Sequence, residues 1–196
     1  MFGLLGQNIL RKLKDKNMEV LMRKEKYVIP TVNFLFRENG DFVSRSTNEL
    51  FDGKRVIIFS LPGAFTPTCS AYQLPGFEEK YEDFRVLGID EIYCISVNDG
   101  FVMNAWAKDQ NIEKVKLIPD GNAYFTRSMG YFVNKSNLGF GERSWRYAAV
   151  VDNGVIEKLF VEDGMRDNAE TDPYEKSTPE NVFKYVKSTV RENTTV

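Results

Sequence analysis

Cys69 is the side chain of this 196-residue sequence whose setting most favours nucleophilic chemistry. It ends the segment Pro62-Gly-Ala-Phe-Thr-Pro-Thr-Cys69, between an apolar run and a stretch of helical character. The first turn of a helix offers unpaired N–H groups and a positive dipole end, which favour the reactive thiolate. Thr66 lies three residues before the sulfur, and two prolines stiffen the loop. The segment therefore predicts a reactive thiolate. Attack on a peroxide would need donors aimed at two oxygens, and a permanent cation would help both the thiolate and the leaving group. An inert, buried thiol is the alternative for a cysteine without such a motif.

The composition argues against several other kinds of site. Histidine is absent, which removes Ser-His-Asp and Cys-His nucleophiles and histidine acid–base catalysis. Cys69 and Cys94 are the only cysteines, too few for a disulfide framework or a zinc site. A net charge of -2 gives no general attraction to nucleic acid or to an anionic membrane. No apolar run approaches the roughly 18 residues that a membrane span needs. We therefore expect one soluble domain.

Strands and helices alternate along the chain around this cysteine. The apolar run 56–59 is typical of a strand buried on both faces, and it leads directly into the cysteine loop. A helical stretch over about 70–87 follows, which Pro75-Gly76 should kink or interrupt. We expect the other strands at 32–36, 92–97, 115–118, 147–151 and 155–160, with hairpin turns at Asn39-Gly40 and Asp152-Asn153-Gly154. We expect the other helices at 48–51, after the cap Asp99, from Asp120 to Gly130, and from Thr178-Pro179 onward. This order indicates an α/β sandwich with a central mixed sheet flanked by helices.

The segment around Cys69 resembles the active-site signature of the peroxiredoxins. The likeness is to the atypical, type II (Prx5-type) branch and to the peroxiredoxin part of peroxiredoxin–glutaredoxin hybrids. It implies a thioredoxin-like fold in which Thr66 replaces the first cysteine of Cys-x-x-Cys. The matching blocks lie between about residues 28 and 187, and they are Ser60–Ser70, Leu74–Phe77, Ser96–Asp99 with Phe101–Met103, Pro119–Asn122, and Leu138–Gly141 leading to Arg143–Tyr147.

The resemblance implies a role for each matching site residue. Cys69 would be the peroxidatic nucleophile, Thr66 would hydrogen-bond its sulfur or the bound peroxide, and Pro62 would shield the sulfenic acid. Arg146 matches the active-site arginine of the family, and Arg143 is the competing candidate. The alternative for either arginine is a surface ion pair, which contributes little to stability.

Two departures from the family pattern bear on the mechanism. Gln73 stands where family members often have histidine, and the stretch 163–173 lacks the resolving cysteine of some Prx5-type enzymes. We expect Cys94 to be a packed core thiol, although a resolving role after local unfolding is the alternative. One cysteine then forms a sulfenic acid, and an external thiol reduces it. Glutathione with glutaredoxin is the first choice of reductant and thioredoxin the second, with no metal, haem or nucleotide cofactor.

Other expectations concern the surroundings of this site. A peroxide sensor that uses the same cysteine is the alternative to an antioxidant enzyme. The resemblance also implies a homodimer, for which Phe65, Leu138 and Phe140 are candidate contacts, each of which could instead be core. Residues 1–26 carry a net charge of +4 and are expected to form a basic N-terminal extension before a domain at 27–196. We expect a cytoplasmic protein, with an organelle-targeting peptide in 1–26 as the alternative.

Overall fold

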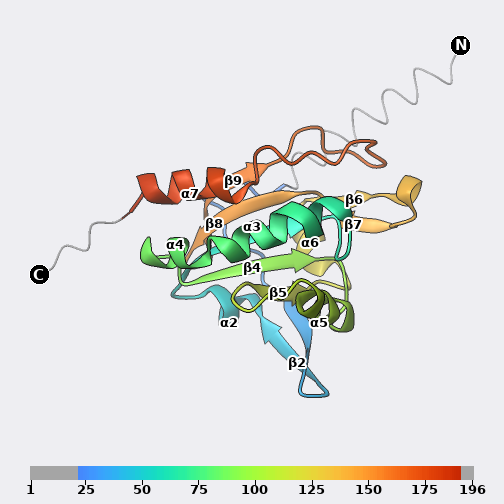
Figure 1. The fold of residues 1–196 in the computed structure, drawn as a ribbon, viewed down its shortest axis with the longest axis horizontal. Coiled ribbons are helices and arrows are strands. Elements are labelled where there is room, and N and C mark those ends of the chain that lie inside the picture. Colours follow the sequence, from blue (N-terminus) through green and yellow to red (C-terminus); the bar gives the residue numbers. More distant parts are fainter. Residues whose placement is uncertain (1–21, 191–196) are drawn as a thin grey trace, which may run out of the picture.

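The computed structural model describes residues 22–190, which form a central mixed sheet with helices on both faces (Figure 1). The sheet has five strands in the order β5-β4-β3-β8-β9. β3, β4 and β5 are parallel to one another, whereas β8 is antiparallel to its neighbours β3 and β9. The predicted α/β sandwich with a mixed sheet is therefore confirmed. The five strands are β3 (Arg55–Leu61), β4 (Glu91–Ser96), β5 (Lys116–Pro119), β8 (Tyr147–Asp152) and β9 (Val155–Val161).

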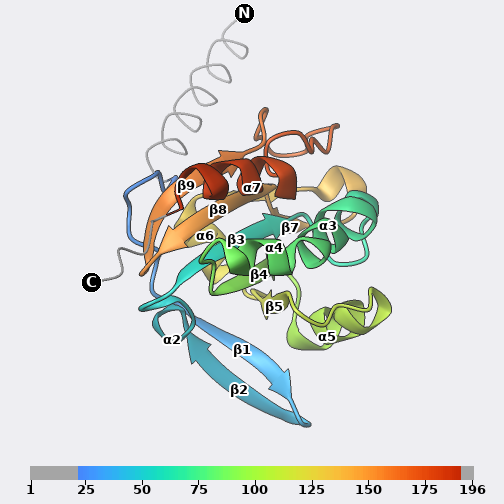
Figure 2. The ribbon, with the colours of Figure 1, turned by 60° about the vertical axis from the view of Figure 1, so that its left-hand side comes forward.

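The sheet divides the core into two apolar layers, because successive residues of a strand point to opposite faces. Val56 and Ile58 of β3 pack with α2 (Thr47–Phe51) and α6 (Tyr124–Met129). Ile57 and Phe59 pack instead with the other helices of residues 22–190. These helices are α3 (Leu74–Glu79), α4 (Tyr81–Val86), α5 (Gly100–Asp109) and α7 (Pro179–Ser188), of which α3, α4 and α7 lie over this face in Figure 2. Cys69 belongs to this second layer.

The N-terminal hairpin projects from the sandwich at the bottom of Figure 1. It pairs β1 (Asn33–Glu38) with antiparallel β2 (Asp41–Ser46). Both turn residues have positive φ, 51° at Asn39 and 88° at Gly40, as a two-residue turn between twisted strands requires. The predicted hairpin is confirmed.

The helical stretch around Cys69 is interrupted, although at Lys80 and not at Pro75-Gly76, where the sequence predicted it. It includes a π-helical segment, η1 (Cys69–Gln73), which continues into α3 and then breaks at Lys80 before α4. Pro75 lies in the first turn of α3 and has no N–H to donate to the π turn before it. Two other predicted caps are also confirmed: Asp99 accepts hydrogen bonds from the first turn of α5, and Thr178 caps α7.

Two local features differ from the sequence prediction. Helix α6 begins at Tyr124 rather than at Asp120, although it ends at Gly130 as expected. The carboxylate of Asp120 reaches forward to accept hydrogen bonds from the N–H groups of Phe125 and Thr126, so it caps the helix from outside. A short ladder of β6 (Phe132–Asn134) and β7 (Glu142–Ser144), joined through the 3₁₀ turn η2 (Ser136–Leu138), was not predicted.

The first described residues of the chain hydrogen-bond to the sandwich. Arg23 N donates to Met129 O over 2.8 Å, and Lys26 N donates to Ile156 O over 2.6 Å. Residues 1–21, and with them most of the predicted basic extension, lie outside the described part of the chain. Within residues 22–190, no helix is long and apolar enough to cross a bilayer.

Candidate active site

Cys69 is the first residue of η1 and lies in the first turn of the helical stretch that begins at Pro67, as the sequence predicted. Its side chain is fully buried, and its carbonyl accepts a hydrogen bond from Leu74 N that closes the wide π turn. Ser70 N donates to Thr66 O over 3.0 Å and joins this turn to the preceding loop. π turns inside helices are frequent at functional sites. The thiol therefore sits at the start of a helix and away from bulk water.

The loop before Cys69 is fixed by the end of the neighbouring strand β4. Asn98 Oδ1 accepts a hydrogen bond from Ala64 N over 3.0 Å and another from the Ser96 hydroxyl over 2.7 Å. Phe65 has a φ of 61°, in the left-handed region that costs an aromatic residue conformational energy. Pro62 is buried. The loop therefore has a defined and locally strained shape.

Arg146, the residue just before β8, lies against the sulfur. Its side chain is 1% exposed, and Nη1 is 3.4 Å from Cys69 Sγ and 2.6 Å from Gln73 Oε1. Burial lowers the pKa of this guanidinium, but the charges of Cys69 and Asp172 and the hydrogen bonds to them outweigh burial and raise the pKa overall. Arg146 is therefore a permanent cation beside the thiol. Gln73, where an imidazole was the family expectation, supplies an amide oxygen that orients it.

The other edge of the Arg146 guanidinium is held by the loop between β9 and α7. Nη2 lies 2.6 Å from each carboxylate oxygen of Asp172, and Nε donates to Pro173 O over 3.1 Å. The Tyr174 ring lies 5.6 Å from the guanidinium carbon. Charge-assisted bonds of this kind are short and directional. The guanidinium is thus fixed on every edge.

Glu162, at the end of β9, anchors the same loop from inside the protein. Its carboxylate is 3% exposed and accepts hydrogen bonds from the backbone N–H groups of residues 175–177, over 2.7 to 3.0 Å. It also accepts the Ser177 hydroxyl, and the same hydroxyl oxygen lies 3.4 Å from Gln73 Nε2. Glu162, Ser177 and Gln73 therefore connect the loop to Arg146 through buried polar contacts.

Two further cations lie near the thiol. Arg143 donates to two backbone carbonyls, Phe140 O from Nε and Val97 O from Nη1. A Cβ at Gly63 would lie 2.9 Å from Nη1, so the glycine of the cysteine loop leaves room for this arginine. Lys135 is 1% exposed, and its ammonium lies 5.4 Å from the Trp145 ring centre. Burial lowers the pKa of both groups, and the charge of Cys69 opposes this effect.

Thr66 and Cys94 are the remaining residues that the sequence analysis singled out. The Thr66 hydroxyl donates to Gly63 O over 2.8 Å, and its contact with the sulfur or with a peroxide stays a prediction. Cys94 lies in the middle of β4, fully buried, in the same apolar layer as Cys69. Burial, and next the charge of Cys69, raise the pKa of the Cys94 thiol well above its ordinary value. Both thiols are free.

Sequence reasoning missed the partners of Arg146. The sequence of the loop 163–173 showed only that it has no resolving cysteine, whereas the loop contributes the carboxylate of Asp172. Lys135 had no signal at all, because a lone lysine in a polar segment is normally on the surface. Glu162 ends a strand, where an acidic residue usually marks the beginning of a solvated loop. In residues 22–190, no group of three or more histidine, cysteine, aspartate or glutamate side chains is arranged to hold a metal ion.

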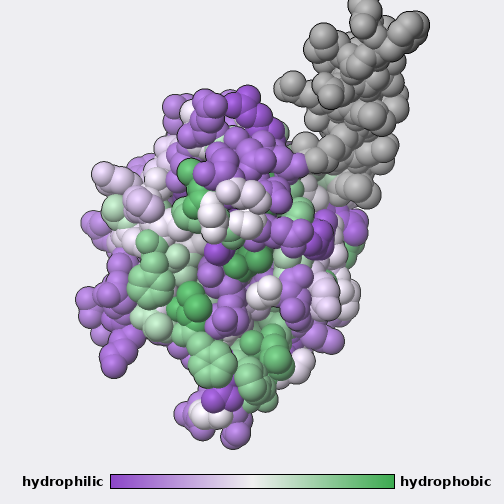
Figure 3. Space-filling model, turned by 90° about the vertical axis from the view of Figure 1, so that its right-hand side faces the viewer, coloured by the Kyte–Doolittle hydropathy of each residue, from purple (hydrophilic) through white to green (hydrophobic). Residues whose placement is uncertain are grey.

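Apolar side chains gather on the face of the molecule at the right of Figure 1, as Figure 3 shows in its lower half. Of the three candidate dimer contacts, Phe65 and Leu138 are exposed, at 53% and 49%, and Phe140 is half-buried. Neither of the exposed residues is therefore core.

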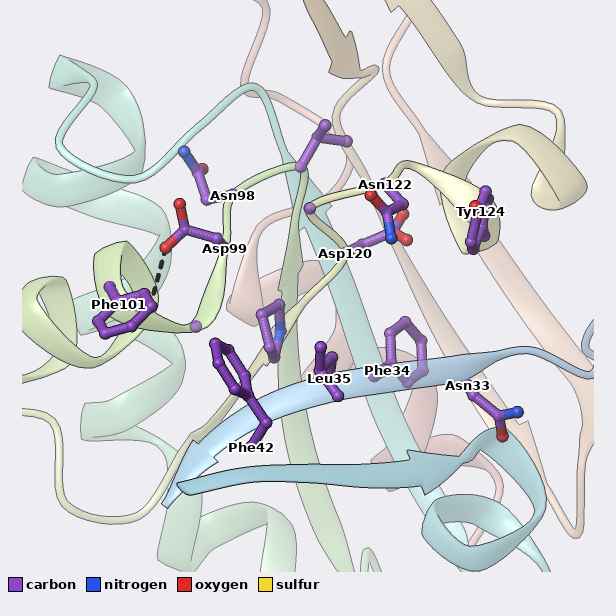
Figure 4. A pocket seen from close by; sticks show the side chains of 14 residues that line it. Asn33, Phe34, Leu35, Phe42, Asn98, Asp99, Phe101, Asp120, Asn122 and Tyr124 are labelled. Carbon is purple, nitrogen blue, oxygen red and sulfur yellow. Dashed lines mark hydrogen bonds between the residues drawn. The ribbon is translucent and has the colours of Figure 1, made fainter. Parts of the chain in front are cut away.

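A pocket of about 510 Å³ lies between the N-terminal hairpin and the loops after β4 and β5 (Figure 4). Leu35 and Phe42 line it from the hairpin, and Asn98 and Phe101 line it from the opposite side. Cys69 is not among its lining residues. The pocket therefore touches the cysteine loop only through Asn98 and does not contain the thiol.

Comparison with known proteins gives consistent results. The Redoxin family matches residues 24–176. A peroxiredoxin from Rhizobium etli is 55% identical over 176 residues, which cover 85% of this chain and 98% of that protein. A hybrid peroxiredoxin from Haemophilus influenzae is 49% identical over 158 residues, 81% of this chain and 64% of its own length.

Solved structures show the same likeness. The Plasmodium falciparum antioxidant protein, described as a 1-Cys peroxiredoxin, superposes with a TM-score of 0.81 at 44% identity, over 85% of this chain and 99% of that one. Reduced Prx3 from Vibrio vulnificus in complex with H2O2 superposes with a TM-score of 0.77 at 36% identity, over 84% and 99%.

Proposed function

The chain belongs to the peroxiredoxins, within the Redoxin family, and on that premise we propose that Cys69 is the peroxidatic nucleophile of a one-cysteine enzyme. Peroxiredoxins reduce peroxides at the expense of thiols, so the chain is a peroxidase and an oxidoreductase. The observation that carries the assignment of the nucleophile is the 3.4 Å contact between Cys69 Sγ and Nη1 of the buried Arg146.

The proposed reaction is a displacement at oxygen. The Cys69 thiolate attacks the terminal oxygen of a hydroperoxide, the S–O bond forms, and the O–O bond breaks. A hydroxyl group is thereby transferred to sulfur as a sulfenic acid, and the alkoxide or hydroxide that leaves takes a proton from solvent. Arg146 holds positive charge beside both the thiolate and the leaving oxygen. Thr66 is proposed to bind the sulfur or the peroxide, and the buried Pro62 to shield the sulfenic acid.

We propose that an external thiol completes the cycle. It condenses with the sulfenic acid, releasing water and leaving a mixed disulfide, and a second thiol then displaces Cys69 by exchange. Burial of Cys94 in β4 and the absence of any other cysteine support this choice over an internal disulfide. Glutathione with glutaredoxin is the proposed reductant, because the chain resembles the peroxiredoxin part of peroxiredoxin–glutaredoxin hybrids and a hybrid peroxiredoxin is among its relatives; thioredoxin is second.

Turnover assays with defined electron donors test this proposal. Peroxide consumption is followed for the wild type, Cys69→Ser and Cys94→Ser, with glutathione and glutaredoxin or with thioredoxin. We expect Cys69→Ser to abolish consumption and Cys94→Ser to keep most of it. Residual turnover in Cys69→Ser would refute the assignment of the nucleophile, and faster turnover with thioredoxin would refute the choice of reductant.

We also propose that the protein is a cytoplasmic homodimer. Phe65 lies in the cysteine loop and Leu138 ends η2, before β7, and both are exposed. Dimerisation would remove their apolar surface from water. Analytical ultracentrifugation of the wild type and of Leu138→Glu tests the association. We expect a dimer that the charged variant weakens, and a monomeric wild type would contradict the proposal.

A further inference from the structure

Asp172 puts a negative charge close to Cys69, where it would repel a thiolate. Its side chain is 37% exposed at the surface of the site, and both of its oxygens lie 2.6 Å from Nη2 of Arg146. The same guanidinium faces Cys69 through Nη1. A negative charge at this place repels a thiolate and neutralises part of the charge of the arginine. Its effect on the thiolate therefore gives no reason for a carboxylate here.

Geometry does give a reason. With Asp172 and Pro173 O bound at Nη2 and Nε, the guanidinium plane cannot rotate, and the remaining nitrogen, Nη1, is directed at the sulfur and at Gln73. A planar fork held at two nitrogens presents its third in one direction. We propose that Asp172 is a positioning residue of the peroxidatic site, which fixes Arg146 so that Nη1 faces Cys69. This inference rests on the proposed function of Cys69.

The loop that carries Asp172 is itself held on both sides, as a positioning element must be. On the side toward α7, Glu162 binds the backbone of residues 175–177. On the other side, Asn168 N donates to Asn134 O over 2.7 Å, and Asn134 N donates to Asp167 Oδ1 over 3.0 Å. Asp172 therefore lies between two anchored points, and a shift of the loop would be transmitted to Arg146.

Lys135 adds a second buried cation beside the same carboxylate. Burial lowers the pKa of its ammonium, and the charge of Asp172 opposes this more strongly than the charge of Cys69 does. The backbone of Lys135 is fixed, since its N–H donates to Gly141 O and its carbonyl accepts from Phe140 N. The charge of Asp172 thus acts on two buried cations, Arg146 and Lys135.

The two effects of Asp172 predict opposite results when its charge is removed. If the carboxylate acts only as a charge, its loss leaves a more positive site and faster reaction with peroxide. If it positions Arg146, its loss lets the guanidinium turn and the reaction slows. The slowing should persist on the alkaline plateau of the pH profile, where every molecule carries the thiolate, because Arg146 also faces the leaving oxygen.

The experiment measures the second-order rate constant of Cys69 with hydrogen peroxide across pH, by stopped-flow tryptophan fluorescence. Trp106, whose indole N–H donates to Ser70 Oγ over 3.0 Å, lies next to the cysteine turn and should report the reaction. We expect Asp172→Ala and Asp172→Asn to lower the plateau rate constant by about 10- to 100-fold, as misplacement of a catalytic group does. Asp172→Glu, which keeps the carboxylate, should recover part of the loss.

Asp163→Asn is the matched control, because Asp163 lies in the same loop, is 83% exposed and pairs only with Lys176 among the described ion pairs. We expect its plateau rate constant to stay within about twofold of the wild type, as surface ion pairs contribute little. Unchanged or faster reaction of both Asp172→Ala and Asp172→Asn would overturn the inference. If Cys69→Ser reacts with peroxide as fast as the wild type, the proposed function itself is refuted. Failure of the inference about Asp172 and failure of the proposed function are therefore distinguishable.

Discussion

Substitution of Arg146 by lysine tests the geometry of the site most directly, because it keeps the positive charge and removes the planar, forked arrangement of the guanidinium donors. The guanidinium makes contacts from three nitrogens, to Cys69 and Gln73 from Nη1, to both oxygens of Asp172 from Nη2, and to Pro173 O from Nε. An ammonium has one nitrogen with three hydrogens. A lysine therefore cannot serve the sulfur and Asp172 in the same conformation.

The size of the effect follows from which contact the lysine keeps. The ion pair with Asp172 has the shorter distances, 2.6 Å against 3.4 Å to the sulfur, so the ammonium should remain with the carboxylate. The thiolate and the leaving oxygen then lose their donor. Removal of one such donor costs about 10²- to 10³-fold in rate, or about 2.7–4 kcal/mol. We expect a loss of this size in the rate constant for peroxide.

The assay is single-turnover oxidation of Cys69 by hydrogen peroxide, with melting curves recorded on the same samples. Arg127→Lys is the control for the chemical change alone, because Arg127 is 48% exposed and pairs with Glu142 at the surface. Arg143→Lys tests the rival arginine, which donates only to backbone carbonyls among the described hydrogen bonds. We expect Arg127→Lys to react like the wild type. A near-normal rate for Arg146→Lys, or a larger loss for Arg143→Lys, would refute the assignment of Arg146.

Three further substitutions have definite expected outcomes. Cys94→Ser should lower the free energy of unfolding by about 1–3 kcal/mol, because it buries an unpaired hydroxyl in β4, yet keep most turnover; loss of turnover would make Cys94 a resolving cysteine. Lys135→Met should raise the free energy of unfolding at neutral pH, because burial lowers the pKa of the folded ammonium and so makes its charged form unfavourable. Because the pKa of folded Lys135 is lowered from 10.5, the stability of the wild type rises relative to that of Lys135→Met as the pH increases toward 10.5. The difference between their free energies of unfolding should therefore narrow, and urea titrations at neutral and alkaline pH measure it. A difference that widens would contradict this expectation. Glu162→Gln places amide hydrogens against backbone donors and should cost about 3 kcal/mol, with faster hydrogen exchange at residues 175–177; unchanged protection there would contradict the anchoring role.

Much of the fold follows from local rules that the sequence displays. The buried strand β3 appears as an unbroken apolar run, the hairpin turn at Asn39-Gly40 as two residues that tolerate positive φ, and α5 as a helix behind the cap Asp99. Each of these signals depends on residues close together in the chain. The position of Cys69 at the start of a helix could be predicted for the same reason.

The parts that could not be predicted depend on contacts between distant residues. β6 and β7 have three residues each, too few for an alternating pattern, and their pairing is decided by the sandwich around them. The start of α6 was misplaced because Asp120 caps it from four residues away. Asp172 is 26 residues from Arg146 in sequence, and only the path of the loop after β9 brings them together.

The electrostatics of this site depend on charges that do not change near neutral pH. The sequence has no histidine, and Gln73 offers an amide oxygen where an imidazole would titrate at about 6.5. The raised pKa of Arg146 keeps the cation in place in alkaline solution. With no imidazole to donate, the leaving oxygen must take its proton from solvent. The rate of peroxide reduction should therefore rise with the thiolate and stay level through the neutral range, whereas a fall in that range would require a titrating imidazole, which the sequence does not contain.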